Sequence, residues 1–124
     1  DRISAINLLC GAGYKVGILI APVIMVEDWK ELYKELIIEL SVSLSVKAKK
    51  QVFFEIIFMT YSFVHDKINT EAFPNAISIY NKDKMRGRGR GKYMYKQELI
   101  EDGKKFLLEQ MHKYFPENKI EYIV

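Results

Sequence analysis

Two continuous apolar runs constrain the fold more than any other feature of this sequence. The first, Tyr14–Ala21, is almost wholly apolar after Lys15. The second, Val52–Met59, is interrupted only by Glu55. Runs of this length and composition predict strands that are buried on both faces, as in a parallel sheet. A third strand is expected over Lys119–Val124.

Helices are predicted between and around these strands. In three of them apolar residues recur every three or four positions, which is the spacing of one helix face, and Ser62 can cap the fourth. The four segments are Ile3–Cys10, Trp29 to about Ser41, Ser62 to about Phe73, and Gln97–Phe115. Strands that alternate with helices of this length favour parallel pairing, so the expected fold class is α/β.

The connecting segments contain residues that end helices and strands. Ala21-Pro22 is expected to stop the first strand, and Asp28 to cap the helix after it. Ser41–Lys50 predicts a helix end and a loop, whereas Ala76–Tyr80 is compatible with either a short helix or a short strand. We expect residues 1–124 to form a single unit, 49% apolar. Three buried strands are few for a free-standing sheet, so further N-terminal structure is expected.

A basic window lies in the second half of the chain. From Lys82 to Lys96 there are seven Lys or Arg residues and one Asp, so the window carries a net charge of +6 in a chain whose total is +3. The positive charge is therefore concentrated in one short element, and the remainder of the chain is net negative. Clustered positive charge indicates a polyanionic partner rather than a general solubilising surface.

Within this window three arginines alternate with three glycines. Period-two alternation predicts that Arg86, Arg88 and Arg90 lie on one side of an extended segment, where their guanidinium groups match phosphate. Two interpretations are open: a disordered Arg-Gly tail, or an ordered β-hairpin at about residues 84–96. The hairpin is preferred because the run lies between structured elements and passes into Tyr93–Tyr95, which alternates as a strand does.

The chemistry expected of this hairpin is nucleic-acid binding. An arginine-rich edge followed by aromatic residues fits contacts to the phosphate backbone with limited reading of sequence. A nucleotide or another phosphate ligand is the competing interpretation. The expected contact residues are Arg86, Arg88, Arg90 and Lys92 for phosphate, with Tyr93 or Tyr95 available to stack on a base.

No other group of residues predicts catalysis. Glu55 is either a structural partner for a lysine or a backbone amide, or a polar group at the mouth of a barrel. The single cysteine, Cys10, is expected in the core, and His65 and His112 at solvent-facing helix positions, so no metal site is expected in this chain. One cysteine and no long apolar span favour a reducing, cytoplasmic setting without a membrane partner.

Several short pieces of the chain, taken together, are similar to one known family. They are Ala12-Gly13-Tyr14, Gly17–Pro22 with the Trp29 helix, Phe54–Ile57, Gly91–Tyr95, Phe115-Pro116 and Ile120–Tyr122. The chain resembles the C-terminal part of spore photoproduct lyase, a family of radical S-adenosylmethionine enzymes that repair DNA. The resemblance covers almost the full length of the chain.

The resemblance implies the C-terminal part of a partial (β/α) barrel with mainly parallel strands and a basic β-hairpin that engages damaged DNA. In this family S-adenosylmethionine and a [4Fe-4S] cluster generate a 5′-deoxyadenosyl radical, which abstracts hydrogen from the spore photoproduct, a methylene-bridged thymine dimer. The cluster cysteines and the hydrogen-donor cysteine lie upstream in such enzymes, so no catalytic residue is expected here. Ile20, Ala21 and Pro22 match a strand end that packs beside the adenine of S-adenosylmethionine.

We therefore expect the C-terminal half of a spore photoproduct lyase in the cytoplasm of the spore core. Its expected partners are DNA containing the spore photoproduct and the N-terminal half of the same protein. The alternative is a non-catalytic α/β nucleic-acid-binding module in which the Arg-Gly hairpin acts alone. A Cys-x-x-x-Cys-x-x-Cys run upstream of Asp1 would favour the enzyme.

Overall fold

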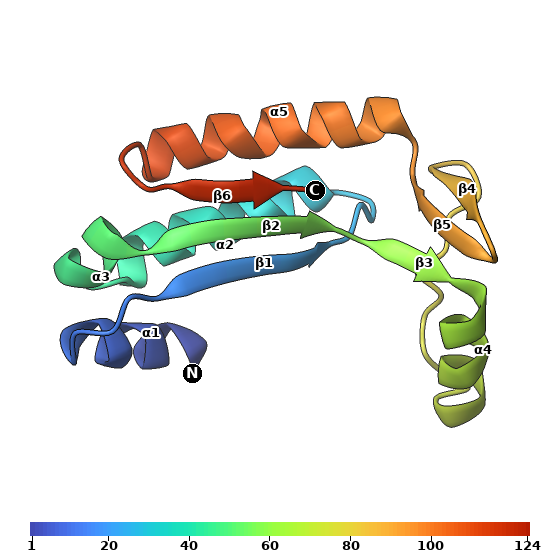
Figure 1. The fold of residues 1–124 in the computed structure, drawn as a ribbon, viewed down its shortest axis with the longest axis horizontal. Helices are drawn as coiled ribbons and strands as arrows, with labels where there is room; N and C mark the ends of the chain where they lie inside the picture. Colours follow the sequence, from blue (N-terminus) through green and yellow to red (C-terminus); the bar gives the residue numbers. More distant parts are fainter.

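The structure, a computed structural model, describes residues 1–124 and contains two small sheets and five helices (Figure 1). The first sheet has the order β1-β2-β6 and is parallel throughout. Its strands are β1 (Gly17–Val23), β2 (Phe53–Phe58) and β6 (Ile120–Ile123). The predicted α/β class and the three parallel strands are confirmed.

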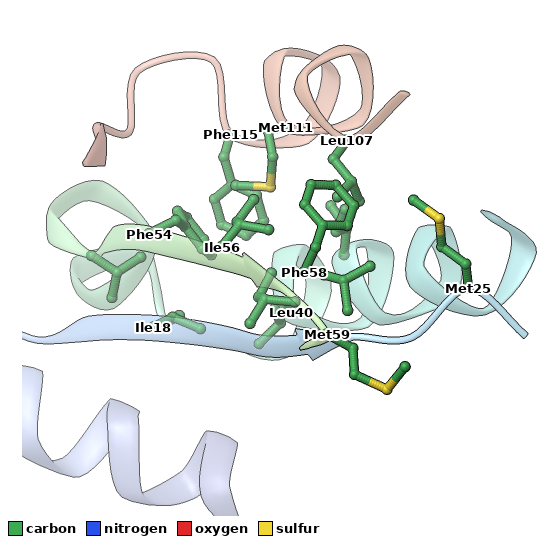
Figure 2. Packing of buried hydrophobic residues seen from close by; sticks show 14 of the residues in the cluster. Ile18, Met25, Leu40, Phe54, Ile56, Phe58, Met59, Leu107, Met111 and Phe115 are labelled. Atoms are coloured by element: carbon green, nitrogen blue, oxygen red, sulfur yellow. The ribbon is translucent and has the colours of Figure 1, made fainter. Parts of the chain in front are cut away.

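One face of this sheet forms the main core, because β2 places alternate large apolar side chains on it. Phe54, Ile56 and Phe58 are all buried, and they point toward Leu107, Met111 and Phe115 (Figure 2). The Phe54 and Phe115 rings meet edge-on at 4.9 Å between centroids. The helices that supply this packing are α2 (Trp29–Ser43) and α5 (Gln97–Tyr114).

The two covering helices also contact each other. Trp29 lies edge-on to Phe106 with ring centroids 5.5 Å apart, and Lys30 Nζ is 2.8 Å from an Asp102 carboxylate oxygen. Gly103 lets α5 approach the sheet, since a Cβ there would lie 2.8 Å from the Phe58 ring. The long apolar stripe predicted for Gln97–Phe115 thus has the packing role that its periodicity indicated.

Two further helices, α1 (Arg2–Gly11) and α3 (Val46–Gln51), pack against each other. The Asn7 side chain joins them to the end of α2, because it donates to the Ser43 carbonyl at 3.0 Å and accepts from the Ser45 amide at 2.8 Å. Cys10 is fully buried, as predicted for a core residue.

Four local expectations are wrong. Pro22 does not stop the first strand, because β1 continues to Val23 through a register shift after Ile20 that accommodates a residue without an N–H group. Ser41–Lys50 includes the end of α2, as expected, but most of the expected loop is helix α3, whose N-terminus is capped by the Ser45 hydroxyl accepting from the Ala48 amide at 3.1 Å.

The other two concern Asp28 and Ala76–Tyr80. Asp28 precedes α2 with a left-handed φ of 61°, and its side chain makes no capping hydrogen bond. Residues 76–80 form neither a helix nor a strand. The loop leads instead into Tyr80, whose ring packs on Tyr61 and Tyr93 of the second sheet.

The second sheet lies beyond the carboxyl end of β2 and is antiparallel, in the order β3-β5-β4 (Figure 1). Its strands are β3 (Thr60–Ser62), β4 (Met85–Gly89) and β5 (Lys92–Tyr95). Helix α4 (Phe63–Ala72), close to its predicted bounds, follows β3 and has no buried residue. None of the helices has both the length and the apolar character needed to cross a membrane.

Candidate nucleic-acid interface

Strands β4 and β5 form an antiparallel pair around a two-residue turn at Arg90 and Gly91. Both turn residues have positive φ, 54° and 69°, as a type I′ hairpin turn requires. Gly89 also has a positive φ of 88°, beside a register shift between Gly87 and Gly89. The glycines thus supply backbone conformations that turn the chain tightly, and Arg90 is held in a conformation unusual for a side-chain-bearing residue.

This geometry corrects the expectation that three arginines share one side of a strand. Arg86 is paired with Met94, and its Nη2 lies 3.8 Å from the Met94 sulfur. Arg88 falls within the register shift and lines a cleft beside α4, while Arg90 lies in the turn. All three are exposed and none takes part in an ion pair. Their charges therefore point in different directions and are all free to meet an anion.

The two tyrosines of β5 differ in exposure. Tyr95 is only 2% exposed, and its hydroxyl accepts a hydrogen bond from the Met25 amide at 2.9 Å. Burial raises the pKa of Tyr95, although the hydrogen bond from Met25 opposes the shift. The expectation that Tyr95 is available to stack on a base is therefore wrong, because its ring is part of the core.

Tyr93 is half-buried and belongs to a cluster of three tyrosines. Its ring centroid lies 5.8 Å from that of Tyr61 and 5.2 Å from that of Tyr80. Tyr61 is buried, and desolvation together with the nearby Asp66 carboxylate raises the pKa of Tyr61 to about 12. The cluster fixes the hairpin against β3 and leaves one edge of Tyr93 accessible.

The base of the hairpin is attached to the segment that follows β1. Lys84 Nζ donates to the Met25 carbonyl at 2.8 Å, and the Tyr95 hydroxyl accepts from the Met25 amide. Both backbone groups of Met25 are thus held by the two ends of the hairpin. Sequence inspection did not find this attachment, since Met25 and Tyr95 are 70 residues apart and neither carries a motif.

A cleft of about 660 Å³ separates the hairpin from α4. Arg88 and Lys92 line it from the hairpin side, and His65, Asp66 and Asn69 from the helix side. His65 and His112 are both exposed helix residues, as expected. The helix side of the cleft was not found from the sequence, where α4 showed only capping and breaking signals.

The family model for spore photoproduct lyase matches residues 1–124. The chain belongs to the spore photoproduct lyase family. The resemblance inferred from short motifs is confirmed over the whole chain.

Relatives within the family have similar sequences at moderate identity. The chain is 29% identical over 128 residues to the spore photoproduct lyase of Clostridium acetobutylicum, and 29% identical over 125 residues to that of Bacillus subtilis. It is fully covered by the first match and 98% covered by the second. It spans only 37% and 36% of the length of these relatives, so the family's enzymes are much longer than this chain.

Solved spore photoproduct lyase structures share the fold. One, complexed with dinucleoside spore photoproduct, superimposes with a TM-score of 0.90 at 25% identity, covering 99% of this chain and 37% of that one. A variant with bound AdoMet and dinucleoside spore photoproduct gives a TM-score of 0.89 with the same coverage. The mixed α/β fold with its parallel three-stranded sheet therefore matches solved structures of this family.

This chain lacks side chains that could hold an iron-sulfur cluster but has an exposed apolar strand end that could contact S-adenosylmethionine. The single cysteine, Cys10, is buried, and no group of three or more His, Cys, Asp or Glu side chains is arranged to hold a metal ion. These residues do not fit the ligand set of an iron-sulfur cluster, which is held by several cysteine thiolates. Ala21 and Pro22 are exposed at the end of β1 and offer apolar contact, whereas the Ile20 side chain is buried in the core.

Glu55 lies on the opposite face of β2 from the main core and is half-buried. Its partner is neither a lysine nor a backbone amide but Tyr122, which stands beside it on β6. Partial loss of solvent, the Glu55 charge and a hydrogen bond to Glu55 raise the pKa of Tyr122. With exposed Leu19 on β1, these residues form a polar and apolar patch on the less covered face of the sheet.

Proposed function

We propose that this chain is part of a spore photoproduct lyase, in which hairpin β4–β5 holds DNA that contains the spore photoproduct. The observation that carries the proposal is the family match over residues 1–124. The hairpin supports it independently, because none of its exposed cations is in an ion pair.

In this proposal Arg86, Arg88, Arg90 and Lys92 contact phosphates of the DNA backbone. Each is exposed and none takes part in an ion pair, so binding requires no ion pair within the protein to be broken. Neutralising phosphates releases condensed counterions, which makes such binding strongly dependent on salt. Tyr93, with one side held by Tyr61 and Tyr80, is the remaining candidate for a base contact.

The cofactors are assigned to the assembled, full-length enzyme, a partial barrel to which β1, β2 and β6 contribute. S-adenosylmethionine and a [4Fe-4S] cluster supply radical chemistry when bound. Ala21 and Pro22 would contact the adenine through their exposed apolar surface, and Ile20 through its backbone only, since its side chain is 5% exposed. The cluster ligands and the hydrogen donor belong to parts of the enzyme that this chain does not contain.

The proposal is tested by replacing Arg86, Arg88 and Arg90 with alanine in the full-length protein. DNA binding should weaken, and the slope of log K against log salt should fall by up to about 0.9 for each phosphate that the protein no longer neutralises. Binding is measured by fluorescence anisotropy with duplex DNA over a range of salt concentrations. Repair of the spore photoproduct is measured in parallel.

A matched control removes the same number of positive charges far from the hairpin. Lys50, Lys105 and Lys113 are exposed on α3 and α5. Their replacement by alanine should leave the salt slope unchanged within error. Equal slopes for the two triple variants would remove the hairpin from the interface. DNA binding without any repair by the wild-type full-length protein would favour a non-catalytic binding module.

A further inference from the structure

The cleft between α4 and the hairpin has two sides, and only one is accounted for by the proposed function. Arg88 and Lys92 form the hairpin side. The helix side is formed by α4, which buries none of its residues and so contributes little to the core. The main contacts of α4 are with β3 and the hairpin turn, so most of its surface is free to meet a ligand.

The end of the cleft near the hairpin turn is cationic. The Phe63 amide at the start of α4 donates to the Gly91 carbonyl at 2.8 Å, which brings this end of the helix beside Arg88 and Lys92. Two cations and one carboxylate, Asp66, leave the lining with a net positive charge. None of the three is in an ion pair.

Neutral hydrogen-bonding side chains continue along the helix side. Ser62, Asn69 and Thr70 line the cleft, and their side chains make no hydrogen bond within the protein. They can therefore donate to a ligand without losing a partner. Phosphate oxygens are commonly bound by this combination of cations and neutral donors.

The other end of the cleft is apolar. Phe73, at the C-terminus of α4, is 67% exposed, and Ile77 in the following loop is 92% exposed. The ten residues of α4 separate this end from the hairpin turn by about 15 Å, given the rise of a helix. Large exposed apolar side chains beside a polar cleft are typical of binding sites.

We infer that this cleft binds a short single-stranded segment of DNA, with a phosphate at Arg88 and Lys92 and the base of a neighbouring nucleotide against Phe73. The inference rests on the proposed function and extends it from the hairpin to α4. The volume of about 660 Å³ suits a ligand of this size. A charged groove beside an exposed aromatic ring is the usual arrangement for binding unpaired nucleotides.

The first test places a negative charge in the cleft without changing its shape. Asn69→Asp in the full-length protein adds one negative charge inside the cleft, whereas Lys67→Gln lowers the net charge equally on the same helix but outside the cleft. Both positions are exposed, so neither variant should disturb folding. Asn69→Asp should weaken binding of a single-stranded oligonucleotide about fivefold, the size expected for like charges about 4 Å apart in water. The affinity of Lys67→Gln for the same oligonucleotide should stay within about twofold of that of the wild type.

The second test concerns the base. Phe73→Ala should weaken binding of the oligonucleotide at least about fivefold, because stacking on an aromatic ring contributes roughly 1–3 kcal/mol per base. The loss should disappear with an abasic strand of the same length. The control Ile68→Ala removes a comparably exposed apolar side chain of α4 that does not line the cleft.

The outcomes separate this inference from the proposed function. If the triple arginine variant loses DNA binding while Asn69→Asp matches Lys67→Gln and Phe73→Ala matches Ile68→Ala, the inference is wrong and the hairpin assignment stands. If the triple variant binds DNA as its lysine control does, the proposed function is wrong, and the nucleotide site falls with it. If Asn69→Asp weakens binding of a mononucleotide but not of DNA, the ligand is a free nucleotide, which overturns the strand assignment.

Discussion

The parallel sheet and the hairpin sheet of this chain are built for different purposes. Phe54 and Ile56 in β2 are completely buried, and the helices around them add further fully buried side chains such as Ile37 and Leu107. In contrast, β4 buries only Met85, and α4 buries nothing. The first region is stabilised by packing, whereas the second exposes charge and is held by a few tyrosines. Substitutions should therefore affect stability in the first region and binding in the second.

The largest effect on stability is expected from Phe54→Ala. This side chain is fully buried against Phe115, so its removal should lower the free energy of unfolding by about 3–5 kcal/mol. The comparison is Ile68→Ala on α4, where the side chain is 57% exposed and the change should stay within about 0.5 kcal/mol. Urea unfolding of the full-length protein measures both. Similar losses for the two variants would contradict the contrast between the regions.

A smaller loss is expected from Gly103→Ala. The new Cβ would lie 2.8 Å from the Phe58 ring, which is itself buried, so overpacking should cost about 1–3 kcal/mol. Gly87→Ala in the hairpin meets only Tyr93, at 3.8 Å, and should be neutral or stabilising by up to about 1 kcal/mol. Thermal unfolding of both variants checks this. A stabilised Gly103→Ala would mean that α5 lies farther from the sheet than described.

The smallest effect is expected from Tyr61→Phe, and it depends on pH. The folded chain raises the pKa of Tyr61 from 10.0 to about 12, so its neutral form is favoured by folding. The contribution of neutral Tyr61 to the free energy of unfolding is fully present below pH 10 and is lost as the pH rises toward 12. Below pH 10 the variant should be less stable by about 1 kcal/mol, because it lacks the polar interaction of the hydroxyl with the Asp66 carboxylate.

The same measurement at alkaline pH completes this test. Since phenylalanine does not ionise, the difference between wild type and variant should shrink as the pH rises from 10 toward 12. Unfolding free energies at several pH values show whether it does. Parallel curves across this range would mean that Tyr61 is not buried against Asp66 in solution.

The fold was largely predictable because its core strands carry a local signal. The run containing Phe54, Ile56 and Phe58 is apolar enough to identify β2 without any partner, and α5 shows its buried face as a periodicity. The strand β3 was missed because Thr60–Ser62 is short and polar. Its pairing with β5, Thr60 opposite Met94, depends on a contact between distant parts of the chain.

The candidate site was less predictable, since its details depend on backbone geometry and distant contacts. Arg86 and Arg88 were assigned to one row with Arg90 on alternation alone, but positive φ at Arg90 ends the strand before the third arginine. Tyr95 beside a basic run suggested an exposed ring, whereas the fold buries the ring in the core and pairs its hydroxyl with the Met25 amide. The helix side of the cleft has no sequence motif, because it consists of ordinary exposed residues that the fold brings opposite Arg88.

The attachment of the hairpin at Met25 has a consequence for the entropy of binding. A flexible Arg-Gly tail must become ordered when it meets nucleic acid, and the reduction in conformational freedom lowers its affinity. Here Lys84 and Tyr95 already hold both backbone groups of Met25, so the base of the hairpin is ordered during folding. The same basic composition can then act as a preorganised ligand for phosphate, with the conformational cost met before the partner arrives.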